Sequence, residues 1–542
     1  MGKNRNKNYD VESDVDMKGA NDGRTSKTSR NNRRSSRSNA YSGKTTGCRY
    51  NHDNDPAWYG KSPALLRDAA SLAFSNVTGN PIRWSSLFTS TLESSMPGIL
   101  TLKWIPSYFS TNESTASKQN EALNVSGKNI YSYVRHANSG SANYDWQDLM
   151  LTIIAADNIF SLLAMGIRAY GIAMQWEQKN RYTPEHLLTA MGFDATSILN
   201  DLAGFRYRLN LMIQKSSVIW VPTNMPIVAR HFWLNSNIYL DNLSAKAQFY
   251  LYRMVGYYTF ENTTSTSGGK LKFNKLTDGM TAQQYFDLVN SAMEILITDE
   301  EAGIMFGDML KAYGKESLYS VSTIDENFRV VPSYSAEVLL QIHNAVSIPL
   351  DLGDDAIASY DITQDVDNGA LNPPQWLTNV AASQGMRNAL MAVGATSILN
   401  FKGTEVPDPS MIMVATRSRN TVITVSAPEG SDAGIEVLTG SEIIAGFTVY
   451  KLNSSTLVGR DFSTVIVNDI SHTYVVTISD VSKFDWAPIL YVIGETDAPN
   501  PTSILQGVYG DIDNYTIITP QDVDKMNQTA IMSELDVPIT LG

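Results

Sequence analysis

The chain has very little cysteine, and this limits its chemistry. Cys48 is the single cysteine among 542 residues. No disulfide can form within one chain, which is the pattern of a protein made and kept in a reducing compartment. Zinc or redox sites built on paired cysteines are excluded for the same reason. We expect Cys48 to be an unpaired surface thiol, and pairing between two copies stays open.

Signatures of the common enzyme classes are also missing. Each Gly-Lys pair past the start lacks the upstream glycine that a P-loop requires. There is no G-x-S-x-G elbow of a hydrolase and no H-E-x-x-H helix of a metalloprotease. We therefore predict no catalytic residues, no metal and no cofactor. An enzyme whose active residues lie far apart in the sequence stays an open alternative.

Two acidic runs suggest calcium at first sight. They are Asp351–Asp355 and Asp361–Asp367, and neither has the glycine and glutamate that an EF-hand loop places at its sixth and twelfth positions. Solvated loops are the better interpretation. A polar patch at Arg135, His136, Asn138 and Ser139 could hold a site, but such patches more often satisfy turns and backbone ends in packed interfaces.

Segments that would place the chain in or across a membrane are not apparent. The start, MGKNRNKNYD, has no apolar core, so we predict no secretory signal. The most apolar stretch, Leu149–Met174, contains Asp157, Asn158 and Arg168. Those polar groups would be costly in lipid, so we predict a buried helix.

What the sequence does contain is a sharp division of charge. Residues 1–50 hold twelve Lys/Arg and five Asp/Glu, a net charge of +7. Because the whole chain carries −13, residues 51–542 sum to −20. A basic, apolar-poor arm on an acidic globular body suggests a protein that grips a polyanion through a flexible tail, and a solvated terminus without a partner is the alternative.

The arm, residues 1–56, has almost nothing to bury, so we predict that it is disordered. Few aromatic residues accompany its basic cluster, which leaves phosphate contact without sequence readout. The predicted RNA-contacting residues are Arg24, Lys27, Arg30, Arg33, Arg34, Arg37, Lys44 and Arg49.

Two textures follow the arm, and together they predict an α+β protein. Helical periodicity dominates residues 57–265 and continues through 266–404, with helices expected after Thr183, over 195–215 and over 337–347. Capping-box spacing predicts helix starts at Thr281 and at Thr298. A strand is expected over Met96–Ile105. Residues 405–542 are β-rich with a loosely built tail, and the strands expected there are 411–415, 421–425, 447–452, 463–467 and 474–478.

One long run carries a resemblance to a known family. KNIYSYVRHANSGSANYDWQDLM (Lys128–Met150) resembles the picobirnavirus capsid protein. MPGIL (Met96–Leu100) precedes it, and RYTPEHLLTAMGFD, RHFWLNSNIYLDN and SAKAQFYLY follow in a similar order. The specific resemblance covers residues 96–252, and residues after 270 are similar only in length and texture.

The resemblance implies a structural coat protein of a small virus with a double-stranded RNA genome. It implies two-fold dimers, sixty of which close an icosahedral lattice, in a virion assembled in the host cytoplasm. It also implies a mainly helical shell domain (57–265), a projecting β-rich region (405–542) and an inward-facing arm (1–56), with 266–404 in either part. The partners are other copies of the chain and viral RNA bound without sequence preference, with the packaged polymerase as a further candidate and host surfaces unassigned.

The charge division acquires a role in this interpretation. Seven net charges match about four base pairs of duplex, so the arms would recruit RNA without neutralising a genome. An acidic inner wall would then keep the packed duplex from adhering. The main alternative is a nucleoprotein that coats a strand without a closed shell. That alternative requires a basic groove on a body whose net charge is strongly negative.

Overall fold

The computed structural model describes a defined part of the chain. Its residues are 62–70, 81–82, 94–95, 97–109, 119–140, 144–175, 182–223, 225–243, 247–261, 268–378, 384–403, 406–426, 433–453, 456–467, 473–495 and 503–535. Two compact units are distinguished, residues 1–74 and 75–542. The helix α1 (Pro63–Ala70) is the described element of the first unit. The arm and its eight predicted contact residues lie outside the described residues.

The second unit is built on one long helix, α3 (Trp146–Gln175), which is buried along nearly its whole length. Within the described residues, α3 is the one helix whose length and composition would allow it to cross a bilayer, and protein covers it throughout. The prediction of a buried helix is therefore confirmed. Six further helices pack against it: α2 (Ala122–Ala137), α4 (Tyr182–Ala190), α6 (Leu202–Lys215), α7 (Pro226–Leu234), α8 (Ala282–Thr298) and α9 (Glu300–Tyr313).

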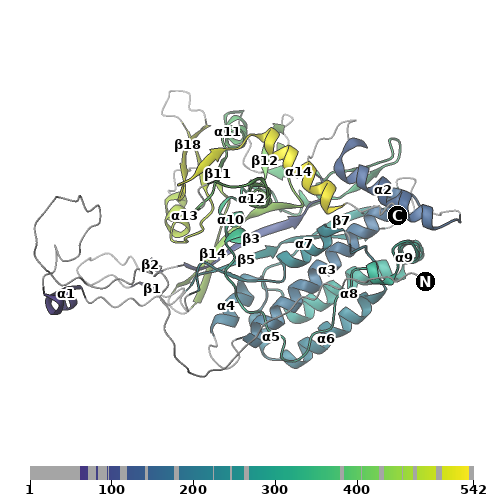
Figure 1. Ribbon diagram of the computed structural model, residues 1–542, viewed down its shortest axis with the longest axis horizontal. Coiled ribbons are helices and arrows are strands. Elements are labelled where there is room, and N and C mark those ends of the chain that lie inside the picture. The colour runs from purple at the N-terminus through teal and green to yellow at the C-terminus, as the bar shows by residue number, and fades with distance from the viewer. Residues whose placement is uncertain are drawn as a thin grey trace, which may run out of the picture. The chain divides into compact units, whose positions relative to one another are not determined.

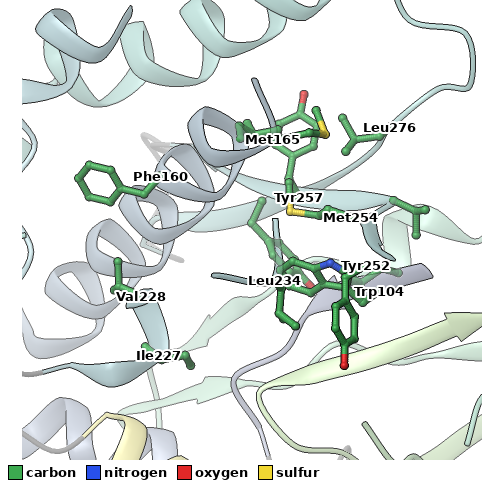
Figure 2. Packing of buried hydrophobic residues seen from close by; sticks show 14 of the residues in the cluster. Trp104, Phe160, Met165, Ile227, Val228, Leu234, Tyr252, Met254, Tyr257 and Leu276 are labelled. Atoms are coloured by element: carbon green, nitrogen blue, oxygen red, sulfur yellow. The ribbon is translucent and has the colours of Figure 1, made fainter. Parts of the chain in front are cut away.

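Polar residues inside α3 are tolerated because the protein supplies partners for them. Asn158 donates to the Tyr108 hydroxyl (2.8 Å) and accepts from the Tyr258 amide (3.0 Å). The Arg168 guanidinium donates to the Asn237 carbonyl (3.2 Å), and burial lowers its pKa to about 9. Figure 2 shows part of the surrounding core, which includes Met165 of α3 and Leu276.

A five-stranded sheet lies on the other side of α3 from α6, α8 and α9 (Figure 1). The strand order is β15 (Thr456–Phe462), β14 (Glu442–Asn453), β3 (Pro97–Pro106), β5 (Phe249–Met254) and β4 (Tyr239–Leu240). β14 pairs antiparallel with β3, with Ile443 opposite Ile105, and β3 pairs parallel with β5. The predicted strand at 96–105 is thus confirmed.

Smaller sheets and helices complete the unit. The sheets comprise β1 (Pro81–Ile82) with β2 (Ser94–Ser95), β6 (Gly256–Glu261) with β7 (Lys270–Lys275), β8 (Thr363–Asp365) with β9 (Ala370–Asn372), β11 (Ile398–Asn400) with β19 (Tyr515–Ile517), the set β10 (Leu377–Thr378), β13 (Ala433–Leu438) and β12 (Thr421–Ser426), and the set β16 (Val465–Val467), β17 (Leu490–Glu495) and β18 (Ser503–Tyr509). The helices are α5 (Ala195–Leu199), α10 (Ala336–His343), α11 (Gln384–Ala395), α12 (Pro409–Ala415), α13 (Thr473–Val481) and α14 (Pro520–Glu534).

The mixed α+β class is confirmed, and the division into four segments stays a prediction. Strands from 57–265 and 405–542 share the five-stranded sheet, because β14 pairs with β3. The strands on either side of residue 265, β6 and β7, pair with each other as well. The predicted boundary at residue 265 therefore falls between two paired strands, and the predicted shell and projecting segments share one sheet.

Two predicted strands are wrong. Residues 411–415 lie in α12 and residues 474–478 in α13. β-branched composition favoured strands there, but Asp408 accepts from the Met411 amide (2.9 Å) and Pro409 occupies the first turn, so α12 has a capped helix start. At this segment the capping residue indicated the secondary structure better than the side-chain composition did.

Helix ends were predicted with mixed success. The capping box at Thr281 is present, with Gln284 as its reciprocal partner. The start at Thr298 is wrong, because Thr298 ends α8 and Asp299 caps α9 by accepting from the Ala302 amide (2.8 Å). The helix expected over 195–215 is interrupted, since Asp201 caps α6 separately.

Candidate functional site

A buried network of ionisable side chains lies beside α3. Asp157 of α3 contacts His231 of α7, with 2.5 Å between the carboxylate and Nδ1, and accepts a bond from the Tyr108 hydroxyl (2.6 Å). The His231 Nε2 lies 2.7 Å from the Ser441 carbonyl. Asp157 and His231 are at most 1% exposed. We call Asp157, His231, Arg230, Ser441 and Glu442 the α3–β14 network.

His231 is placed between two hydrogen-bond acceptors. A neutral imidazole has one N–H, so it can donate to the Asp157 carboxylate or to the Ser441 carbonyl, and the imidazolium can donate to both. Burial is the largest single influence and lowers the pKa of His231, but the Asp157 carboxylate, the Glu442 charge and the Ser441 carbonyl together raise it by more, so the net pKa lies above its usual value. The geometry and the charge balance both favour the protonated ring.

The neighbouring residue, Arg230, forms an ion pair at the start of β14. Its guanidinium donates two bonds to the Glu442 carboxylate, one of them 3.1 Å long, and a third to the Ser441 hydroxyl (3.1 Å). The side chain of Glu442 is 1% exposed. Burial is the largest single influence and raises the pKa of this carboxyl, but Arg230, the Ser441 hydroxyl and His231 together lower it by more, so the net pKa lies below its usual value and Glu442 stays ionised.

The C-terminal helix extends the network. Glu534, at the end of α14, is close enough to Arg230 and Arg417 to interact with both electrostatically. Burial raises the pKa of Glu534, and Arg230 offsets part of that rise. Acidic and basic groups from α3, α7, β14 and α14 are thus gathered between the helical layer and the sheet.

The network is arranged as a structural connection between segments distant in sequence. The Ser441 hydroxyl donates to Glu442 (2.6 Å), whose carboxylate is already paired with Arg230, and His231 contacts the Ser441 carbonyl instead of its hydroxyl, so no free base faces this serine. Breaking such a buried pair leaves an uncompensated charge, which makes its members difficult to replace singly. Its chemical effect is to hold α7 and β14 against α3.

Other sequence candidates also have structural partners. Arg135 pairs with Asp308 of α9 (3.4 Å), and Asn138 donates to the Asp308 carbonyl (3.0 Å), so the polar patch is a packing contact between α2 and α9. Asp361 accepts from Lys270 (3.0 Å) and from the Phe273 amide (2.8 Å). In the part of the chain that the structure describes, no group of three or more His, Cys, Asp or Glu could hold a metal ion.

A surface groove of about 470 Å³ lies between α8 and the β6–β7 pair. Its lining includes Tyr257, Glu261, Lys272, Leu288 and Ile295. These side chains mix apolar and polar character without a gathered set of acids or bases. Five of its ten lining residues are polar, whereas small-molecule pockets are lined mainly by apolar side chains, so the groove does not resemble such a pocket.

Sequence reasoning did not identify the α3–β14 network. Asp157 within an apolar run was a usable signal, because a buried carboxylate requires a partner. The partner could not be named, since His231 is 74 residues away and Glu442 follows 211 residues later.

Comparisons with known proteins extend over most of the chain. The family model described as "Picobirnavirus, Capsid protein" matches residues 58–449. A capsid protein precursor from human picobirnavirus (strain Human/Thailand/Hy005102/-) is 27% identical over 547 residues, covering 95% of this chain and 96% of that protein. A solved X-ray structure of the picobirnavirus capsid superposes with a TM-score of 0.71 at 23% identity, covering 90% of this chain and 99% of that one. The last comparison shows a shared fold.

Proposed function

The chain belongs to the picobirnavirus capsid protein family, and from this premise we propose that its copies form two-fold dimers, sixty of which close a small icosahedral shell around double-stranded RNA. It is a capsid protein and a structural component of the virion. The observation that carries the proposal is the family match over residues 58–449, which spans the helical layer and most of the five-stranded sheet.

The basic arm supports a second part of the proposal, which is nonspecific RNA binding. Its eight cations, Arg24, Lys27, Arg30, Arg33, Arg34, Arg37, Lys44 and Arg49, would contact phosphates inside the shell. Residues 51–542 carry −20, so an acidic inner wall would keep the duplex mobile for a packaged polymerase. Assembly in the host cytoplasm fits a chain with a single cysteine.

Electron microscopy of the purified full chain tests shell formation. Uniform closed particles are expected, and a raised 260/280 nm absorbance ratio of the same fraction would show captured nucleic acid. Dimers or monomers at every salt concentration and pH would contradict the shell. Open filaments with bound RNA would favour the nucleoprotein alternative.

A variant whose arm carries no cations at these eight positions distinguishes RNA binding by the arm from any role of the arm in assembly. Replacing the eight cations by glutamine keeps the length of the arm, and deletion of residues 1–56 removes it. If both variants form empty particles, the arm recruits RNA; particles lost only on deletion would mean that the arm also links subunits. If all eight cations contact phosphate, log K should fall with log salt with a slope of about −7. A flat salt response would contradict the electrostatic account.

A further inference from the structure

The outer face of α6 carries exposed residues of the types that dominate protein interfaces. The side chains of Tyr207, Leu211 and Val218 are 70%, 43% and 49% exposed, and Val218 lies in the turn directly after the helix. Arg206 and Lys215 flank them. Tyrosine and arginine are enriched at contact sites, and an apolar stripe with a charged border matches the usual interface anatomy.

The neighbouring helix, α8, presents charge of the opposite sign. Asp287 and Glu294 are exposed on its surface. Asp287 accepts from Gln283 (2.6 Å) and Glu294 from Asn290 (2.6 Å), both on α8 itself. Neither carboxylate forms an ion pair with a described residue. The acidic groups therefore remain available to a cation from outside.

Contacts between α6 and α8 determine how the basic residues of α6 are aligned with the acidic residues of α8. Phe205 packs on Phe286 with 5.0 Å between ring centroids, and the Lys215 ammonium donates to Asn290 (2.6 Å). Residue numbers therefore increase in the same direction along both helices, so α6 and α8 run in the same general direction. Figure 1 shows the two helices side by side. From these contacts we infer that Arg206, which follows Phe205, lies near the level of Asp287, which follows Phe286, and that Lys215 lies near the level of Asn290 and the next turn of α8.

We propose that this α6–α8 face binds the same face of a second copy across a two-fold axis that runs between the helices and parallel to them. Such a rotation places α6 of each copy over α8 of the other. It leaves the position of each residue along the helix axes unchanged. Arg206 then faces Asp287, and Lys215 faces the turn that holds Glu294. The contact is isologous, so each favourable pair occurs twice. This inference rests on the proposed shell assembly, because it assigns one of the contacts between copies.

The mixture of charges favours a second copy over RNA. A duplex presents only negative charge, so Asp287 and Glu294 would repel it while Arg206 attracted it. A surface that carries both signs in matching order is complementary to itself. The exposed apolar stripe of α6 also gains from burial, whereas a phosphate backbone offers little apolar surface.

A charge exchange on the full chain tests the proposal. Arg206→Glu and Asp287→Arg each place like charges opposite one another twice per dimer, so we expect the association constant to fall at least about tenfold. The double variant R206E/D287R should restore it. Lys525→Glu on α14 is the matched control, with the same reversal of charge on an exposed helix elsewhere. Sedimentation velocity at low salt measures association, and circular dichroism verifies that each variant is folded.

Each result discriminates. Association lost in both single variants and regained in the exchange, with the control unchanged, supports the contact. Single variants that associate like the parent chain overturn it, although closed shells in every sample would leave the proposed function standing. A parent chain that dimerises without closing shells would count against the proposed function, and the exchange would still test the contact. Shells of R206E that form normally but carry less RNA would mean that the face binds RNA, and the two-fold contact would be refuted.

Discussion

Removing Arg230 should destabilise the protein strongly, because Glu442 would remain buried without its cation. In the folded chain Glu442 is 1% exposed, accepts two bonds from Arg230 and accepts one from the Ser441 hydroxyl. Methionine at position 230 keeps much of the length of arginine and removes the charge. The variant Arg230→Met therefore leaves one hydroxyl donor for a carboxylate that water cannot reach.

The expected magnitude follows from the burial of the pair. Breaking a buried ion pair by removing one partner costs about 3–5 kcal/mol. Unfolding entropy is about 2.1 cal/mol/K per residue, so for the unit of residues 75–542 the sum is about 1 kcal/mol/K. The loss corresponds to a fall in Tm of about 3–5 °C. The double variant Arg230→Met/Glu442→Gln should regain most of it, since a neutral amide needs no counter-charge.

Thermal unfolding followed by circular dichroism measures the effect, with the oligomeric state of each variant matched by sedimentation. Lys525→Met is the control, because Lys525 and Asp522 form an exposed pair (3.4 Å) with side chains 75% and 49% exposed. Exposed pairs contribute about 0–1 kcal/mol, so the control should melt within about 1 °C of the parent. Equal melting of Arg230→Met and Lys525→Met would refute the reasoning, as would a double variant no more stable than Arg230→Met.

Two further predictions concern α3 and its neighbours. Because folding raises the pKa of His231, the stability that it contributes is complete below the unfolded pKa of about 6.5 and is lost as the pH rises through the folded pKa. The Tm of the parent chain should therefore fall above pH 6.5 by an amount that is absent from the His231→Gln variant. Equal slopes of Tm against pH in the two proteins would contradict the charged ring. Gly166→Ala should cost about 1–3 kcal/mol, because the new Cβ would collide with the Tyr285 hydroxyl and lie 2.8 Å from Cζ of that ring. Gly303→Ala, on α9 with open space around it, should instead stabilise by about 0.5–1 kcal/mol, and urea unfolding that ranks the two variants in the opposite order would refute this packing argument.

Local signals in the sequence predicted the elements whose causes are local. The apolar run from Leu149 to Met174 predicted α3, and the Thr281–Gln284 spacing predicted the start of α8. Both depend on residues within a few turns of each other, which is the range over which caps and periodicity act. The error at 411–415 arose where composition was given more weight than the capping residue Asp408, and the error at 474–478 arose because β-branched residues there lie in a helix.

The candidate site was only partly predictable. Asp157 could be recognised as a carboxylate that needs a partner, but neither His231 nor Glu442 stands out in its own segment. The sequence RHFWLN, which contains Arg230 and His231, contributed to the family resemblance without indicating which side chain each would meet.

The sequence by itself determined the class of the fold, the buried central helix, the division of charge between arm and body, and the family. These follow from composition, periodicity and a long run of matching residues, all of which are properties of the chain taken in order. Only the tertiary structure decided that β14 pairs with β3, that Asp157 meets His231, and that α6 lies beside α8 with Lys215 bonded to Asn290. Pairings between segments hundreds of residues apart depend on how the whole chain minimises exposed apolar surface and unpaired polar groups, so no local pattern specifies them.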